Sequence, residues 1–228
     1  MIYEQDGPAP YPASEVAPPS AQVAVGTRAA LHHARAKRAF DVVFALLVVT
    51  LMLSWLAPLI ALLIKLESKG PAFFKQLRTG KDGRPFYCLK FRSMAPNAAA
   101  DEQQASRGDH RVTRVGAFLR QTSLDELPQF LNVLRGEMSI VGPRPHMLRH
   151  TEYYAGEIHN FMDRHRALPG ITGLAQVSGL RGETKELDAM NKRVQADLHY
   201  LRTWSFWLDV KIVGRTVAQV VVRNENVF

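Results

Sequence analysis

Two adjacent carboxylates, Asp125 and Glu126, are the residues of this sequence best suited to chemistry, and the segment around them permits two interpretations. In the first, Ser123 and Glu126 form a capping box that begins a helix, and both acidic residues complement the helix dipole. In the second, the pair acts on phosphate, because a carboxylate can attack phosphorus and carboxylates also hold Mg²⁺ against substrate phosphates. A helix N-terminus at this point would add exposed N–H groups that suit a phosphate.

Phosphate chemistry also requires positive charge, and arginine suits it because its planar fork contacts phosphate oxygens in a bidentate manner. Arg144 stands between Pro143 and Pro145, which restrict the backbone, so it is a candidate for a rigid phosphate clamp. A solvated turn is the alternative interpretation of this loop. The other basic candidates are Lys90, Arg92 and Arg120.

A glycine-bearing loop covers residues 169–179 and includes Gln176. Glycine lets a backbone approach a nucleotide closely, although the same composition is typical of ordinary turns. His146 and His150 have a spacing that can bind zinc on a helix. No third ligand cluster accompanies them, so we do not expect a zinc site.

The overall charge of the chain agrees with a phosphate-rich partner. The formal net charge is +8, which favours nucleic acid, anionic lipid headgroups or nucleotide substrates. No recognised nucleic-acid-binding motif is present, so we do not expect nucleic acid as a partner. The single cysteine, Cys88, cannot form an internal disulfide, which suggests a reducing compartment.

The element that would position these residues in the cell is an apolar run between Asp41 and Lys65 that contains no charged residue. It is long enough to cross a bilayer, and the alternative, a buried core helix, rarely stays apolar on every face. Pro58 cannot donate to the Ser54 carbonyl, so we expect a break at Pro58. Both flanks are basic, and the cytoplasmic flanks of membrane helices are enriched in lysine and arginine. We therefore expect a re-entrant helix over 35–66 that returns to the side from which it entered.

The rest of the chain divides into a tail and a folded domain. Residues 1–34 combine proline with small residues and predict a disordered tail. Residues 72–74 and 85–89 flank a glycine-bearing turn and predict a β-hairpin. Apolar spacing predicts helices over 112–120, 123–138, 186–203 and 206–222. The last of these is basic and amphipathic and begins beside Trp204 and Trp207, so it either lies on a membrane surface or packs on the domain.

Together these features resemble the bacterial sugar transferase family, the monotopic polyprenyl-phosphate phosphoglycosyl transferases. The similarity runs from residue 37 to about residue 221. Its blocks stand in the order of the family: the apolar segment with its proline, then 70–76, 90–94, 119–129, 138–145 and 169–173. Each block alone is weak evidence for the family, but six blocks in the order of the family are specific for it.

The resemblance implies a predominantly helical α+β fold in three parts. These are the tail over 1–34, the re-entrant membrane helix over 35–66 and a cytosolic catalytic domain over 67–228 with a short β-hairpin and interfacial amphipathic helices. It also implies the bacterial inner membrane as the location, with the active site on the cytoplasmic face, and Mg²⁺ as the cofactor.

The resemblance further implies roles for individual residues. Asp125 would be the nucleophile and Glu126 its partner, both of them Mg²⁺ ligands, and Pro58 would break the membrane helix. The implied substrate-binding residues are Lys90, Arg92, Arg120, Arg144, Gln176 and Arg181.

The implied reaction moves a hexose 1-phosphate from a UDP-sugar to undecaprenyl phosphate through a covalent aspartyl intermediate and releases UMP. It would be the first membrane step of exopolysaccharide synthesis, with downstream glycosyltransferases as partners. Residues 179–184 resemble members that use glucose 1-phosphate, and galactose 1-phosphate is the alternative. A catalytically silent membrane scaffold in a polysaccharide assembly complex is a second alternative, but a scaffold has no physical need for the carboxylate pair.

Overall fold

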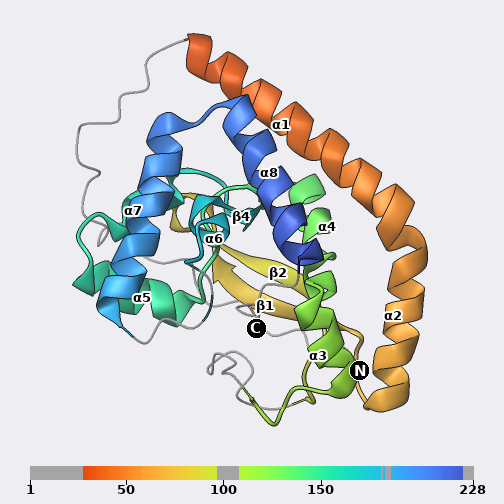
Figure 1. Ribbon diagram of the computed structural model, residues 1–228. Helices are drawn as coiled ribbons and strands as arrows, with labels where there is room; N and C mark the ends of the chain where they lie inside the picture. The colour runs from red at the N-terminus through yellow and green to blue at the C-terminus, as the bar shows by residue number, and fades with distance from the viewer. Residues whose placement is uncertain (1–27, 97–107, 181, 183–185, 223–228) are drawn as a thin grey trace.

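The computed structural model describes residues 28–96, 108–180, 182 and 186–222, and it confirms a mostly helical α+β fold (Figure 1). The helices are α1 (Arg28–Val48), α2 (Ser54–Glu67), α3 (Arg114–Gln121), α4 (Gln129–Arg135), α5 (Leu148–Glu157), α6 (Leu174–Val177), α7 (Leu187–Thr203) and α8 (Phe206–Val221). The strands are β1 (Phe73–Thr79), β2 (Pro85–Phe91), β3 (Ser139–Val141) and β4 (Gly170–Thr172). A π-helical stretch covers Val49–Leu53, and 3₁₀ turns cover Lys81–Gly83, Leu124–Glu126 and Phe161–Arg166.

The predicted hairpin is confirmed, and its register decides which side chains share a face. β1 and β2 pair antiparallel, with Gln76 opposite Cys88 and Phe74 opposite Lys90. The two other strands form a second small sheet, in which β3 and β4 pair in parallel. All three residues of β3 are buried, so this short sheet lies inside the domain.

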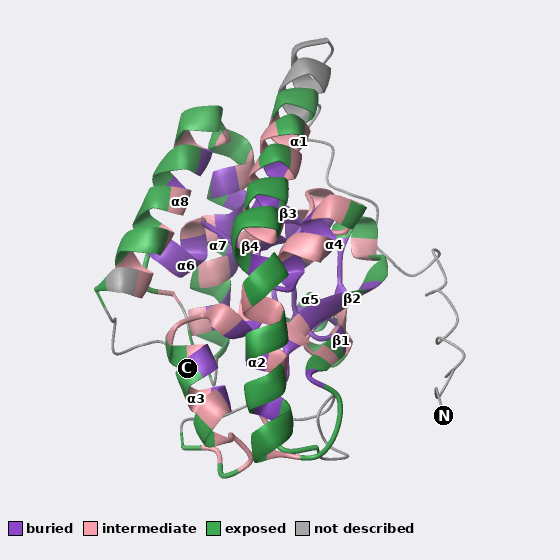
Figure 2. Ribbon diagram, turned by 90° about the vertical axis from the view of Figure 1, so that its right-hand side faces the viewer, coloured by how far each residue is buried: buried purple, intermediate pink, exposed green. Residues whose placement is uncertain are grey.

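The long apolar helix is present and faces outward. Its span Arg35–Glu67 is long and apolar enough to cross a membrane, and most of that surface is not covered by the domain (Figure 2). Its exposed large apolar side chains are Val43, Leu46, Leu47, Leu51, Met52, Trp55, Leu59, Leu62, Leu63 and Leu66. A core helix of a soluble protein would bury these side chains, so that alternative does not fit.

Two expectations about this helix are corrected. α1 begins at Arg28, earlier than the expected boundary at residue 35, because residues 28–34 are rich in helix-forming alanine and contain no proline. Residues 1–27 of the predicted tail lie outside the described residues. The helix also continues through Pro58, which lies inside α2, and it bends earlier, at Val49–Leu53 (Figure 1). A π-helical turn is a recognised cause of a kink. In this one the Ser54 N–H donates to the Val49 carbonyl, five residues back, shortly before the proline.

Both ends of the long helix are tied to the same domain. Near its start, the Arg38 guanidinium donates to the Val133 carbonyl in α4 at 2.7 Å. Just beyond its end, the Arg92 guanidinium donates to the carbonyls of Ser68 at 2.9 Å and Lys69 at 2.7 Å. The domain therefore fixes the entry and the exit of the helix at two separate places.

A buried ionic cluster adds to the first attachment. Lys37 Nζ lies 3.0 Å from Asp41 Oδ1 in α1 and 2.9 Å from Asp209 Oδ2 in α8. Asp209 also accepts hydrogen bonds from the Tyr200 hydroxyl at 2.8 Å and the Trp204 indole at 3.1 Å. These bonds compensate for the desolvation of two carboxylates that are almost fully buried.

The predicted helix over 123–138 is wrong in its extent. The chain instead forms the 3₁₀ turn Leu124–Glu126 and then α4, which ends at Gly136 with φ 83°. Ser123 has φ 56°, a left-handed conformation that cannot begin an α-helix. The other three predicted helices are confirmed within a few residues, as α3, α7 and α8. α8 buries Asp209 and Ile212, so it packs on the domain, and it exposes Trp207 on another face.

Candidate active site

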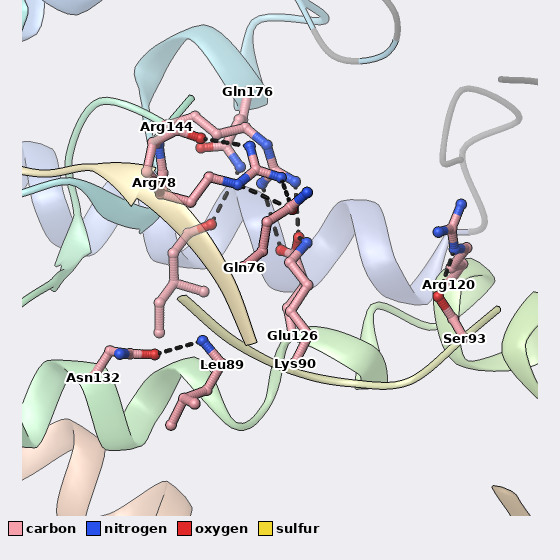
Figure 3. Close-up of polar contacts among 12 residues, drawn as sticks. Gln76, Arg78, Leu89, Lys90, Ser93, Arg120, Glu126, Asn132, Arg144 and Gln176 are labelled. Atoms are coloured by element: carbon pink, nitrogen blue, oxygen red, sulfur yellow. Dashed lines mark hydrogen bonds and ion pairs between the residues drawn. The ribbon is translucent and has the colours of Figure 1, made fainter. Parts of the chain in front are cut away.

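The site is built around Glu126, which accepts ion pairs from two different elements (Figure 3). Lys90 Nζ, near the end of β2, lies 2.7 Å from Glu126 Oε1. Arg144 Nη2, in the loop after β3, lies 2.7 Å from the same oxygen. The fold thus brings together three of the residues that the sequence singled out, although 54 positions separate Lys90 from Arg144 (144 − 90).

The capping-box interpretation of Ser123 and Glu126 is wrong. The Ser123 side chain makes no capping hydrogen bond, and the Glu126 carboxylate points to Lys90 and Arg144 instead. The turn that carries the two acids is only three residues long, so it offers no extended helix N-terminus for a phosphate. Helix capping at this turn therefore does not explain the acidic pair.

The two carboxyl groups have opposite electrostatic environments. Burial and, to a smaller extent, the Glu126 charge together raise the pKa of Asp125 to about 6, against the opposing effects of Lys90, Arg120 and Arg144. Burial would also raise the pKa of Glu126, but the charges of Arg144 and Lys90 outweigh it and hold that pKa well below its usual range. Adjacent acids with diverging pKa values are a common mark of an active site.

Arg120 and Gln176 reach the site from other elements. The Arg120 Nε–H donates to the Ser93 hydroxyl at 2.8 Å, which fixes a guanidinium whose charge acts on Asp125. The Gln176 amide donates to the Ile171 carbonyl at 3.2 Å, while its Oε1 is buried without a hydrogen-bond partner among the described residues. A buried acceptor of this kind is suited to a donor group of a ligand.

One of the predicted substrate contacts, Arg92, is not brought to this cluster. Arg92 is buried and uses its guanidinium on the Ser68 and Lys69 carbonyls, so its contacts hold the end of the long helix. Arg181 lies outside the described residues. The glycines of the predicted nucleotide loop have another role as well: a Cβ on Gly170 would lie 2.1 Å from the Gly142 nitrogen, so they permit close packing of two chain segments.

The sequence interpretation missed Arg78 and Gln76. Arg78 Nη1 donates to the Pro145 carbonyl at 3.1 Å, and its guanidinium also contacts the Gln76 amide oxygen beside Arg144 (Figure 3). Strand alternation was the signal that could have found them, because Gln76 and Arg78 lie on the hairpin face that Lys90 also shares. The site therefore gathers more cations than acids, which suits an anionic ligand such as a diphosphate.

The donor set fits Mg²⁺. The described residues contain no group of three or more histidine, cysteine or acidic side chains that could form an all-protein metal cage. Asp125 and Glu126 are nevertheless adjacent carboxylates, and Glu126 lies beside the cations Lys90 and Arg144. Mg²⁺ commonly binds through one or two carboxylates, with the remaining positions taken by water and substrate phosphates.

Known proteins are similar to this chain over most of its length. A family profile described as bacterial sugar transferase matches residues 32–223. A Caulobacter vibrioides protein named UDP-glucose:undecaprenyl-phosphate glucose-1-phosphate transferase is 53% identical over 189 residues, which are 82% of this chain and 70% of that protein. Proteins of the same name from Escherichia coli K12 and Klebsiella pneumoniae are 54% and 52% identical over 79% of this chain. The chain spans only 39% of the length of each of these two relatives.

Proposed function

The chain belongs to the bacterial sugar transferase family, and from this premise we propose that it transfers glucose 1-phosphate from UDP-glucose to undecaprenyl phosphate. The observation that carries the proposal is the arrangement of Asp125 and Glu126 among Lys90, Arg120 and Arg144. A buried, basic carboxylate surrounded by cations suits nucleophilic attack on a phosphate. The names of the relatives support UDP-glucose as the donor and undecaprenyl phosphate as the acceptor.

In the first step, an oxygen of the Asp125 carboxylate attacks the phosphorus that carries the sugar. The bond between that phosphorus and the oxygen bridging to the uridine phosphate breaks, and UMP leaves with the electron pair. Arg120 and Arg144 take up charge on the transferring phosphoryl group, where fixed cations in a water-poor site are most effective. The product of this step is a sugar phosphate covalently bound to Asp125.

In the second step, an oxygen of the polyprenyl phosphate attacks the same phosphorus and displaces the Asp125 carboxylate. The sugar leaves the enzyme as a lipid-linked diphosphate, and the carboxylate is regenerated. Because the water-soluble donor and the lipid acceptor react in separate steps, they never bind together, so ping-pong kinetics are expected. Glu126 holds Lys90 and Arg144 in place around the phosphorus during both steps.

The cofactor in this proposal is Mg²⁺, which Asp125 and Glu126 would hold together with the donor phosphates. When bound, it would neutralise the diphosphate charge and ease departure of UMP.

The long helix is proposed to be re-entrant, with its membrane segment over 35–66 and the catalytic domain over 67–228, while residues 28–34 form the first turns of α1. Contacts of the catalytic domain with Arg38 at one end and with Ser68 at the other support this arrangement, because one compact domain cannot lie on both sides of a membrane. The active site would then face the cytoplasm at the inner membrane. The exposed Phe206 and Trp207 of α8 would rest in the headgroup region.

The test is release of UMP from UDP-sugars by the purified full-length chain with undecaprenyl phosphate and Mg²⁺. UMP release and a lipid-linked product are expected with UDP-glucose, and a lower rate is expected with UDP-galactose. Faster turnover of UDP-galactose would replace the proposed donor. Absence of UMP release with every UDP-sugar would favour a membrane scaffold over an enzyme.

A further inference from the structure

The loop that carries Arg144 has no helix or strand, yet its backbone is held at every step. The carbonyls of residues 143–146 each accept a hydrogen bond from a different donor. These donors are Gly170 N to Pro143 O at 2.9 Å, Arg164 Nη2 to Arg144 O at 3.0 Å, Arg78 Nη1 to Pro145 O at 3.1 Å and Thr79 N to His146 O at 2.9 Å. The direction of the Arg144 side chain is therefore set by groups outside its own loop.

Among these donors, Arg164 is the most deeply buried side chain. It lies in the 3₁₀ turn Phe161–Arg166 and is 1% exposed, which places it among the largest fully buried side chains of the described residues. Its Nη2 lies 2.5 Å from Asp197 Oδ2 in α7, and its Nη1 lies 2.7 Å from the Nδ1 atom of His146. One guanidinium thus joins α7, the His146 ring and the Arg144 carbonyl.

A contribution to folding stability does not by itself explain why the Arg164–Asp197 ion pair is buried. Burial of an ion pair costs desolvation free energy, and hydrophobic side chains of similar volume are often at least as stable in the same place. The His146 ring fits the network because burial, with the Arg164 charge, holds its pKa well below the usual value and leaves the ring neutral. A neutral ring nitrogen can accept the Arg164 N–H, whereas a protonated ring would repel it.

We propose that Arg164 is a positioning residue that acts through the Arg144 carbonyl and holds the Arg144 guanidinium at the phosphate of the donor. This inference rests on the proposed function, because it assigns a purpose to the direction of Arg144. Arg144 is 42% exposed on its side chain and contacts Glu126 at its tip, so its backbone must be fixed if the tip is to stay in place. A displacement of about 1 Å at a phosphate contact can reduce turnover about a hundredfold.

The experiment uses Arg164→Lys in the full-length chain in lipid nanodiscs. Lysine keeps the positive charge beside Asp197 but lacks the planar fork that reaches the carbonyl and the ring at the same time. We expect kcat/KM for UDP-glucose to fall about tenfold to a hundredfold, UDP to bind more weakly in calorimetry, and the thermal midpoint to change by only a few degrees. Arg166→Lys is the matched control, because Arg166 lies two positions away in the same turn and forms a half-buried ion pair with Asp163.

A double-mutant cycle separates positioning from a general structural role. If Arg164 acts through Arg144, Arg164→Lys should have almost no further effect on kcat/KM or on UDP binding in an Arg144→Ala background. Equal fold-losses in both backgrounds, or wild-type values for Arg164→Lys alone, would overturn the proposal. Should Arg164→Lys fail to fold, Asp197→Asn weakens the hold on Arg164 while keeping an acceptor oxygen, and the same cycle applies.

The wild-type chain distinguishes this proposal from the proposed function. If it binds UDP but turns over no UDP-sugar, the transferase activity fails while the binding arm of the cycle still decides the role of Arg164. If it binds no UDP at all, the phosphate site and the positioning role are both contradicted.

Discussion

At the scale of single residues, the chemistry depends on the contrast between Asp125 and Glu126. Glu126 is held ionised by Lys90 and Arg144, whereas burial raises the pKa of Asp125 to about 6. At neutral pH Asp125 is still mostly ionised, and a carboxylate of raised pKa is the stronger nucleophile. The assignment of nucleophile and partner thus has a physical basis in their surroundings as well as in their order in the sequence.

Replacement of Asp125 by asparagine should remove activity without unfolding the chain. Asparagine keeps the size of the side chain but cannot attack phosphorus, so turnover should fall at least about a thousandfold. The raised pKa makes the Asp125 contribution to stability fall as pH rises from the ordinary 3.8 to about 6 and stay low above that, so a neutral amide should not lower the thermal midpoint at pH 7. UMP release and thermal unfolding measure the two effects.

Asp188→Asn is the matched control, because Asp188 lies on the surface of α7 and pairs with Lys192 there. It should leave turnover unchanged. Near-normal activity of Asp125→Asn, or a trapped sugar-phosphate adduct that maps to another residue, would show that the nucleophile is wrongly assigned.

His165 should make the stability of the fold depend on pH. Burial, together with the smaller effect of the Arg164 charge, lowers the pKa of its side chain to about 3. The unfolded chain therefore binds a proton that the folded chain refuses, and stability should be lost as pH falls from about 6.5 towards 3, by up to about 1.4 kcal/mol per pH unit. His165→Gln should reduce this slope in chemical denaturation at pH 4–7, while the exposed His159→Gln should not. An unchanged slope in His165→Gln would rule out this residue as the cause.

At the scale of elements, the end of the long helix is joined to the helix that leads into the site. Glu67, the last residue of α2, accepts hydrogen bonds from the first two backbone N–H groups of α3, Arg114 at 2.7 Å and Val115 at 3.0 Å. The Thr113 hydroxyl accepts the next one, from Gly116 at 3.0 Å. α3 is therefore capped partly by its own sequence and partly by the end of the long apolar helix, and it carries Arg120 in its last turn.

Removal of this distant cap should destabilise α3. Glu67→Ala leaves two donors to water, and loss of a helix cap costs about 0.5–2 kcal/mol. Thr113→Ala removes the local cap at the same helix end and should cost a similar amount. Chemical denaturation gives both free energies of unfolding, and Lys65→Ala is the control on α2 because the Lys65 side chain is exposed. A Glu67→Ala variant as stable as this control would show that water replaces the carboxylate without loss.

At the scale of the whole molecule, the domain contacts both ends of one long apolar helix. The outward surface of that helix is apolar along its length, while its inward residues join two separate parts of the core. Ala45 packs in a cluster with Val133 and Ile212, and Ile60 packs in another with Phe91. A helix that crossed the membrane completely would have to give up one of these attachments.

The proposed topology predicts that both flanks of the helix lie in the cytoplasm. Arg35→Cys and Lys75→Cys each place a thiol at an exposed position on one side of the apolar run. A membrane-impermeant thiol reagent added to intact cells should modify neither, and should modify both after the membrane is permeabilised. The native Cys88 is buried and burial raises its pKa, so its background reaction should be low. Modification at residue 35 but not at residue 75 in intact cells would establish a true span.

Local patterns in the sequence were sufficient for much of the fold. The apolar run over 42–64, the hairpin around the turn at 80–83 and the helices that became α3, α7 and α8 each depend on neighbouring residues, so periodicity and turn chemistry predict them. The sequence also singled out Asp125 and Glu126, because two adjacent carboxylates with arginine candidates suit phosphate chemistry. Their roles stay predictions until turnover is measured.

Contacts between distant segments were decided only in the tertiary structure. Ser123 and Glu126 have capping-box spacing, but a left-handed Ser123 and the ion pairs of Glu126 with Lys90 and Arg144 exclude it. Arg92 has the residue type of a phosphate ligand, but its guanidinium is occupied by two backbone carbonyls just beyond the end of the long helix. The hydrogen bonds of Glu67 to the start of α3, and of Arg164 to the Arg144 carbonyl, also join distant segments. The physical reason is common to all of them: a side chain of suitable type can pair with any partner within a few ångströms, and packing of the whole chain decides which partner that is.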